Sequence, residues 1–201
     1  LRPPGASASW ELSLEPGKTV YFSYHMLLHE GDKKLPKVES FNEGLAYLKE
    51  SYADWHKSCT SIETDNELFN KLINRSSKDL RLLMESTPQG LVPAAGIPWF
   101  DCILGRDSLI TSLQTLMLNP QIAVNTLRYL AKHQGSKVDP LHEEEPGKIM
   151  EEIRQGELAN LEEIPHAPFY GCVETTPLFL MLFAETMKWL DDDKLFADLL
   201  P

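Results

Sequence analysis

Apolar residues that recur every three or four positions place the strongest constraint on how this chain of 201 residues can fold. The clearest run has intervals of four, three, four and three residues, and it consists of Phe41, Leu45, Leu48, Tyr52 and Trp55. This spacing puts all five on one face of an amphipathic helix, which we expect to continue to about Lys57. Ser40 and Glu43 form a capping-box pattern at its start, because a hydroxyl and a carboxylate three residues apart can satisfy each other's backbone N–H groups.

The same reasoning predicts five further helices. They are expected from a second capping box, Thr64 to Glu67, to about Met84, and then over Asp107–Met117, Pro120–His133, Thr176–Trp189 and Asp191–Leu200. Gly135 is well placed to stop the fourth of the six helices. Short loops join the members of a pair and long loops join the pairs, which is typical of an array of helical hairpins. The sequence therefore predicts a mainly α fold.

The first thirty residues have a different period. Ser7–Leu14 precedes a turn signal, Glu15-Pro16-Gly17-Lys18, and residues 20–28 then alternate between apolar and polar. Alternation of this kind predicts a half-buried strand on each side of the turn. Because a lone hairpin is marginal in water, we expect it to pack against other strands.

Charge and cysteine usage exclude several classes of protein. Lys and Arg number 19 and Asp and Glu number 30, which gives a formal net charge of −11 and argues against binding to nucleic acid or to an anionic membrane. No apolar run reaches the ~20 residues that span a bilayer. The three cysteines are widely spaced, so a zinc site or a disulfide framework is not expected. With no apolar leader at the start, a cytoplasmic protein with reduced thiols fits best.

Three clusters in the long connections carry residues suited to chemistry. The first, residues 96–108, holds Trp99 on a proline-flanked loop and the pair Arg106 and Asp107 at a helix start. An Arg-Asp pair at a helix start can present a carboxylate and a guanidinium together, and a Trp on a proline-flanked loop is also what sugar stacking uses. Alternatively, Asp107 only stabilises the positive end of its helix and Trp99 belongs to the core.

The second cluster, residues 143–157, is acidic but interrupted by Lys148, apolar residues and glycines. An extended backbone there would place Glu152 and Arg154 on one face. A solvated acidic loop is the alternative, and the spacing of a calcium loop is absent, so no metal is predicted. The third cluster, residues 168–177, holds Tyr170 and Glu174 just before a helix. Apolar neighbours would raise the pKa of Glu174, as a general acid requires, whereas a capping acid would have no such role.

In this order and spacing, the clusters resemble the amylo-α-1,6-glucosidase (glycogen-debranching-enzyme-like) group of six-hairpin glycosidases. The matching pieces cover roughly residues 40–190: Gly96-Ile97-Pro98-Trp99-Phe100, Gly105-Arg106-Asp107, Gln134-Gly135, Glu145-Pro146-Gly147-Lys148-Ile149, Glu152-x-Arg154, Gly156-Glu157, Phe169-Tyr170-Gly171 and Thr176-Pro177-Leu178-Phe179. The resemblance implies a partial (α/α)6 toroid with about half of its helical hairpins. Residues 1–35 would be the end of a preceding β-sandwich domain with a linker, and residues 36–201 the N-terminal half of the catalytic domain.

The resemblance also implies a role for each site residue. Members of the family are inverting glycosidases that act on α-glucosidic linkages with two carboxyl groups, one as acid and one as base. Glu174 falls at the general acid and Asp107 at a carboxylate that binds sugar hydroxyls. Arg106, Glu152 and Arg154 would line the pocket, Trp99 and Tyr170 would supply aromatic surface, and no metal or cofactor is needed.

This sequence departs from the family pattern at two positions, where Asp is expected in place of Glu174 and His in place of Glu151. A misplacement of about 1 Å can cost roughly 10²-fold in rate, so slow or altered turnover is expected. A toroid also needs twelve helices, so the base is expected beyond residue 201 and the chain is expected to be an inactive fragment without its C-terminal half. The alternatives are a non-catalytic carbohydrate-binding or assembly module, and a helical scaffold with no sugar site. All sugar-site hypotheses require Asp107 and Glu174 to converge.

Overall fold

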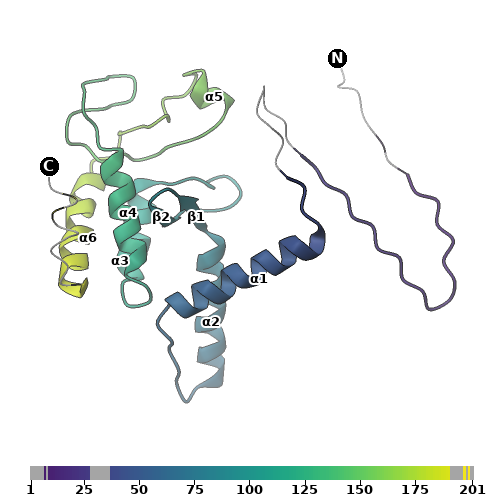
Figure 1. Cartoon of the computed structure of the whole chain (residues 1–201). Helices are drawn as coiled ribbons and strands as arrows, with labels where there is room; N and C mark the ends of the chain where they lie inside the picture. The colour runs from purple at the N-terminus through teal and green to yellow at the C-terminus, as the bar shows by residue number, and fades with distance from the viewer. Residues whose placement is uncertain (1–6, 8, 28–36, 191–196, 198, 200–201) are drawn as a thin grey trace. The chain divides into compact units, whose positions relative to one another are not determined.

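The structure is a computed structural model that describes residues 7, 9–27, 37–190, 197 and 199 (Figure 1). The chain divides into two compact units, Leu1–Glu50 and Ser51–Pro201, and the boundary falls within the first helix. The second unit contains all three of the chemistry-bearing clusters, and it is described in more detail below.

In the first unit, the predicted turn is confirmed but the predicted strands are wrong. The N–H of Lys18 donates to the carbonyl of Glu15 over 3.1 Å, and the rings of Trp10 and Phe22 lie 5.7 Å apart across this turn. Nevertheless residues 9–27 contain no strand, and their apolar side chains stay exposed, as in Tyr21 with 90% of its surface accessible. A two-stranded ribbon needs a partner that buries one face, and no strand of the described residues pairs with this segment. Leu28, the end of the second predicted strand, lies outside the described residues.

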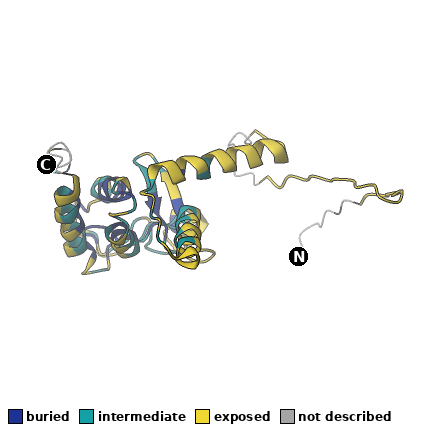
Figure 2. Cartoon of the chain, turned by 90° about the horizontal axis from the view of Figure 1, so that it is seen from below, coloured by how far each residue is buried: buried dark blue, intermediate teal, exposed yellow. Residues whose placement is uncertain are grey.

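The first helix, α1 (Phe41–Ser58), begins as predicted. The N–H of Ser40 donates to Glu43 Oε2 over 2.7 Å, and the N–H of Glu43 donates to Ser40 Oγ over 3.3 Å. These two bonds are the predicted capping box, and the bond from the Ser40 N–H is the main reason why the pKa of Glu43 is lowered. Figure 2 shows that most of α1 is exposed, and among its residues only Trp55 is buried.

The second helix, α2 (Glu67–Leu82), does not begin with the predicted capping box. Asn66 is the cap, since its side chain accepts the N–H of Phe69 over 3.0 Å. Thr64 lies two residues before this cap, and its hydroxyl donates to Asn70 Oδ1 over 2.8 Å and accepts the N–H of Asn66 over 3.2 Å. Asparagine and threonine are both favoured at the cap position, and the structure uses Asn66, which directly precedes the helix.

A β-hairpin follows α2, where the sequence predicts the end of a helix at about Met84 and then a loop with short extended pieces over Thr87–Gly105. β1 (Met84–Thr87) pairs antiparallel with β2 (Gly90–Pro93), in a register that places Met84 opposite Pro93. The side chain of Asn125 donates to the carbonyl of Leu91 over 3.1 Å and so attaches a later helix to β2. A four-residue strand carries too little periodicity to be predicted, and this tertiary bond is one of the contacts that hold it in place.

The described part of the second unit contains four more named helices: α3 (Gly105–Gln114), α4 (Gln121–Lys132), the single-turn α5 (Glu157–Asn160) and α6 (Thr175–Leu190). The predictions of α4 and α6 are confirmed to within one residue at each end. α3 begins two residues before and ends three residues before its predicted bounds, and α5 was not predicted. The predicted helix over Asp191–Leu200 lies largely outside the described residues.

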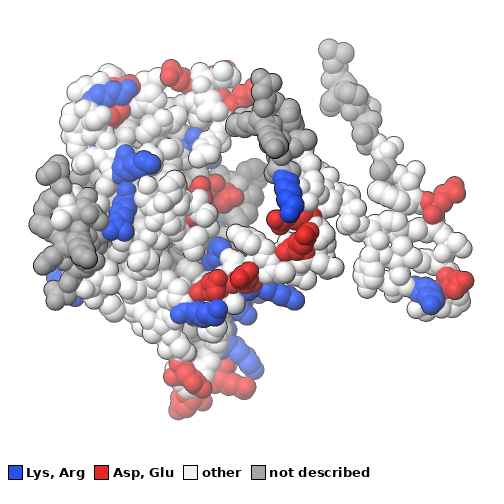
Figure 3. Space-filling model, viewed as in Figure 1, with Lys and Arg blue, Asp and Glu red and all other residues white. Residues whose placement is uncertain are grey.

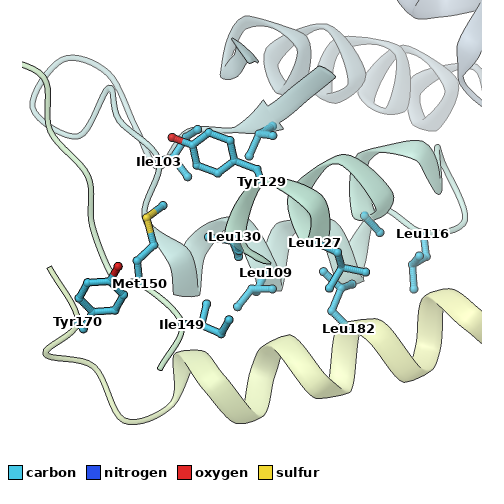
Figure 4. Packing of buried hydrophobic residues seen from close by; sticks show 12 residues of the cluster. Ile103, Leu109, Leu116, Leu127, Tyr129, Leu130, Ile149, Met150, Tyr170 and Leu182 are labelled. Carbon is cyan, nitrogen blue, oxygen red and sulfur yellow. The ribbon is translucent and has the colours of Figure 1, made fainter. Parts of the chain in front are cut away.

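The main hydrophobic core lies between α3, α4 and α6 and is shown in Figure 4. Leu109, Leu127 and Leu182, one from each helix, are 1% exposed or less. Burying a side chain of this size contributes roughly 1.5–3 kcal/mol. A smaller cluster joins Trp55 of α1, Met84 of β1 and Ile122 of α4. The fold is therefore mainly helical with one small two-stranded sheet, and none of the helices in the described part of the chain is long and apolar enough to cross a membrane.

Buried hydroxyl groups fix the relative positions of the elements that carry the site. Ser112 of α3 donates to Thr126 Oγ1 of α4 over 2.9 Å, and both side chains are fully buried. Ser108 donates to the carbonyl of Pro93 over 2.6 Å, which ties the first turn of α3 to β2. Buried polar groups are costly unless they are hydrogen-bonded, so these bonds hold the N-terminal end of α3 in a defined place.

Candidate functional site

The three sequence clusters meet through their backbones at the N-terminal end of α3. The N–H of Gly105 donates to the carbonyl of Glu151 over 2.6 Å, and the N–H of Glu151 donates to the carbonyl of Phe169 over 2.8 Å. The N–H of Phe169 returns a bond of 2.9 Å to the carbonyl of Glu152. Glu152 therefore forms antiparallel bridges with Leu104 on one side and Phe169 on the other.

A glycine is required at the point of closest approach. A Cβ atom on Gly105 would collide with the carbonyl oxygen of Met150 and lie 2.6 Å from Cγ2 of the buried Thr175. The conformation of Gly105 is not left-handed, so the requirement is for space. A glycine is required at position 135 for a similar reason, since a Cβ there would lie 2.5 Å from the carbonyl oxygen of Glu145. Gly135 is therefore needed for loop packing, while His133 is the residue that caps α4.

Arg106 joins the two acids that were predicted to converge. Its Nη1 lies 3.1 Å from Glu174 Oε1, and its Nε lies 3.9 Å from Asp107 Oδ2. The three side chains remain 43–50% exposed, so the group lies on the surface. An ion pair this exposed adds little to stability, but it presents a guanidinium and two carboxylates to solvent.

The pKa of Glu174 is shifted in the direction opposite to the prediction. The hydrogen bond from the Cys172 thiol, the N–H of Glu174 itself and the guanidinium of Arg106 all lower it. The prediction of a raised pKa assumed apolar surroundings, and it is wrong because the carboxyl is half-exposed and accepts several hydrogen bonds. Glu174 is therefore ionised at neutral pH.

The carboxyl group whose pKa is raised is Glu151, which the sequence analysis noted only as a departure from the family pattern. Burial is the main cause, followed by the negative charge of Glu152, and the charge of Glu174 acts in the same direction. Arg106 partly opposes the shift. Two nearby carboxyl groups thus have pKa values moved in opposite directions, which is the arrangement that separates proton donors from charged groups in many active sites.

Glu152 and Arg154 form the second part of the site. Their side chains are paired, and Glu152 is only 13% exposed. Arg154 Nη1 also donates to the carbonyl of Trp99 over 3.2 Å, and Nδ1 of His166 lies 3.8 Å from Glu152 Oε2. The guanidinium of Arg154 lies 5.8 Å from the ring centre of Phe100, close enough for a cation–π contact. These contacts connect the second cluster to the loop of the first.

The two aromatic residues predicted to contact sugar lie in different environments. Trp99 is 79% exposed, on a loop closed by reciprocal backbone bonds of 2.7 and 2.8 Å between Gly96 and Phe100. Tyr170 is only 4% exposed and belongs to the main core, where its hydroxyl donates to the carbonyl of His133 over 2.8 Å. Burial raises the pKa of Tyr170 to about 12. Trp99 can therefore offer a face to a ligand, whereas Tyr170 supports the fold.

The long connection between α4 and α6 is ordered by its own hydrogen bonds. Asp139 and Glu144 exchange two backbone bonds of 3.0 Å, and the buried carboxylate of Glu144 accepts the N–H of Ser136 over 2.8 Å. At least this part of the acidic segment is structural and not simply solvated. Within the described ranges, no three His, Cys, Asp or Glu side chains are placed to hold a metal ion.

Charge on the surface is mixed. Figure 3 shows acidic and basic side chains interspersed over the face it draws, without a single basic patch.

No protein-family model matches this sequence, and none of the curated proteins matches it either.

Proposed function

We propose that this chain carries the sugar-binding part of the active site of an inverting glycoside hydrolase of amylo-α-1,6-glucosidase type, with α-glucans or their oligosaccharides as ligands. The single observation that carries the proposal is the meeting of Asp107, Arg106 and Glu174 at the junction of three distant loops. In this proposal, the helices described above are about half of an (α/α)6 toroid, and the loops at the N-terminal end of α3 form part of its sugar-binding end.

The chemistry of the group suits a neutral polyol. Carboxylates accept hydrogen bonds from sugar hydroxyls and a guanidinium donates to them, and bonds that involve one charged partner are stronger than neutral ones. The exposed ring of Trp99 offers an apolar face of the kind on which the C–H face of a sugar can stack. Glu152 and Arg154 connect the two features through the bond from Arg154 to the carbonyl of Trp99.

A second candidate function, a non-catalytic carbohydrate-binding or assembly module, is favoured by the protonation state of Glu174. A general acid must hold a proton near neutral pH, but hydrogen bonds and Arg106 lower the pKa of this carboxyl. Arg106 also pairs with both Asp107 and Glu174, so neither carboxylate is free of a positive partner. Binding without hydrolysis would be the expected behaviour of such a group, with Glu151 as the remaining carboxyl whose pKa favours a proton.

Calorimetry with maltoheptaose on the 201-residue chain tests the binding step. We expect measurable binding by the parent protein and a loss of about tenfold or more in affinity for Arg106→Ala, because a charge-assisted hydrogen bond is worth about 1.5–3 kcal/mol. Arg75→Ala is the matched control, since Arg75 is an exposed arginine on α2 that is paired with Asp79. Absence of binding by the parent, or an equal affinity of the two variants, would contradict the proposal.

Because the proposed base lies beyond residue 201, hydrolysis is tested on a longer chain that supplies the C-terminal half of the toroid. An assay of glucose release from an α-1,6-branched glucan oligosaccharide then separates the two candidates. Turnover that is abolished in both Glu174→Gln and Glu151→Gln supports the hydrolase. Binding with no turnover supports the binding module. Turnover that is unchanged in Glu174→Gln removes that residue as the general acid.

A further inference from the structure

A cavity of about 200 Å³ is lined by Arg154, which is the one residue that it shares with the residues predicted for the sugar site. Its wall is built from β1, α4 and the segments 101–103 and 153–155, all within the second unit. A water molecule takes up about 30 Å³ of liquid, so the cavity holds roughly six to seven waters. That is the size of one small ring, below the roughly 300–1,000 Å³ of pockets for drug-sized ligands.

Polar groups of both kinds face this space. Glu85 and Asp101 supply carboxylate acceptors, and Arg154 and Gln155 supply donors. Arg154 is held in place by its pairing with Glu152 and by its bond to the carbonyl of Trp99. No salt bridge is found for Glu85 or Asp101 within the described part of the chain, so their oxygens are open to a ligand.

One part of the wall is apolar. Ile103, 1% exposed, and Ile153 line the cavity together with the ring of Tyr129, and Figure 4 shows Ile103 and Tyr129 at the same end of the core. A sugar ring needs such a combination, since its C–H face packs on apolar groups while its hydroxyls meet donors and acceptors around the edge.

We propose that this cavity is a saccharide subsite, which holds one glucosyl unit of the same oligosaccharide that contacts Arg106, Asp107 and Glu174. The inference rests on the proposed function for the class of ligand. Arg154 lines the cavity and also donates to the carbonyl of Trp99 over 3.2 Å, so the cavity adjoins the loop that carries the exposed indole.

A neutral polyol satisfies the cavity better than a cation does. Burial, followed by the negative charge of Asp101, raises the pKa of Glu85, and both carboxyl groups line the same cavity. A cation would relieve that repulsion, but it offers no acceptor to the guanidinium of Arg154, which lines the same space. Sugar hydroxyls donate to the carboxylates and accept from Arg154 at the same time.

The three free cysteines provide a test in the full chain. Cys102 lines the cavity, Cys172 donates to Glu174 at the Arg106 site, and Cys59 packs on the distant cluster of Trp55. All three thiols are partly buried and have raised pKa values caused mainly by burial. Mass spectrometry of each cysteine after timed alkylation with iodoacetamide therefore reports three places at once, with maltotriose, with polyethylene glycol of equal mass concentration, or with neither.

Maltotriose is expected to slow alkylation of Cys102 at least about fivefold at saturation, with Cys59 unchanged and polyethylene glycol without effect. Glu85→Gln and Asp101→Asn should each weaken this protection about tenfold in apparent affinity. Glu163→Gln, which changes an exposed acid outside the cavity, should leave it unaltered.

The remaining outcomes separate this inference from the proposed function. Protection of Cys172 without Cys102 overturns the subsite and leaves the Arg106 site standing. Protection of Cys102 alone keeps a sugar site in the cavity and removes the Arg106 site. Protection of Cys102 by methylguanidinium but not by maltotriose overturns the inference in favour of a cation site, and no protection of either thiol overturns both proposals.

Discussion

Replacing Gly105 with alanine tests whether the junction of the three clusters depends on close backbone contact. The added methyl group would meet the carbonyl oxygen of Met150 and Cγ2 of Thr175, which is fully buried. Neither atom is the end of a flexible side chain, so the backbones must separate. Overpacking of this kind costs about 1–3 kcal/mol. Weakening the 2.6 Å bond from Gly105 to the carbonyl of Glu151 adds about 1 kcal/mol.

A gain in helix propensity acts in the opposite direction but is smaller. Gly105 is the first residue of α3, and alanine is favoured over glycine in a helix by up to about 1 kcal/mol. The net destabilisation is therefore about 1–3 kcal/mol. For a chain of this length each kcal/mol lowers the melting temperature by roughly 2–4 °C, so a decrease of about 2–12 °C is expected.

Thermal and urea unfolding, followed by far-ultraviolet circular dichroism, measure this effect. Gly96→Ala is the matched control, because a Cβ there would have nothing within 4 Å and the residue is not in a left-handed conformation. The control should unfold within about 0.5 kcal/mol of the parent, as surface substitutions usually do. If Gly105→Ala unfolds together with Gly96→Ala, the argument from close packing is refuted.

Three further predictions concern single hydrogen-bonded groups. Asn66→Ala should lower the free energy of unfolding in urea by about 1 kcal/mol, because α2 loses its cap. If Thr64→Ala shows this loss and Asn66→Ala does not, Thr64 is the cap, as the sequence predicted. Tyr170→Phe should cost about 1 kcal/mol, because the part-buried carbonyl of His133 loses the hydroxyl that donates to it. Its affinity for maltoheptaose should stay that of the parent, and a selective loss of affinity would show that Tyr170 belongs to the binding surface. The hydrogen bond from Lys137 is the main cause that lowers the pKa of Asp139 from 3.8 to about 2. Ionised Asp139 therefore stabilises the folded state above pH 3.8, and this contribution is lost as the pH falls towards 2. Melting temperatures of the parent should therefore fall more steeply over that interval than those of Asp139→Asn, and parallel curves would contradict the assignment.

Helix positions were the part of the fold that the sequence predicted best. The bounds of α4 and α6, and the capping box that starts α1, agree with predictions made from periodicity and caps. These features depend on residues within one or two turns of each other, so the local chain contains the necessary information. The same local rules misplaced the start of α2, because Thr64 and Asn66 are both suitable caps and the sequence pattern alone does not choose between them.

The site could be predicted from the sequence only as a set of residue types. The clusters that hold Trp99, Asp107, Glu152 and Glu174 were recognised from their composition and order, and the structure brings their backbones together. Nothing in the linear pattern distinguished the exposed Trp99 from the buried Tyr170, since aromatic residues suit either environment.

The sequence by itself determined the period of the helices, the net negative charge and the identity of the polar residues in the long connections, because each of these is a property of neighbouring residues or of composition. Only the tertiary structure decided the hairpin of β1 and β2, the opposite pKa shifts of Glu151 and Glu174, and the cavity beside Arg154. The physical reason is that burial, electrostatic coupling and cavity shape depend on distances between segments that lie tens of residues apart in the chain.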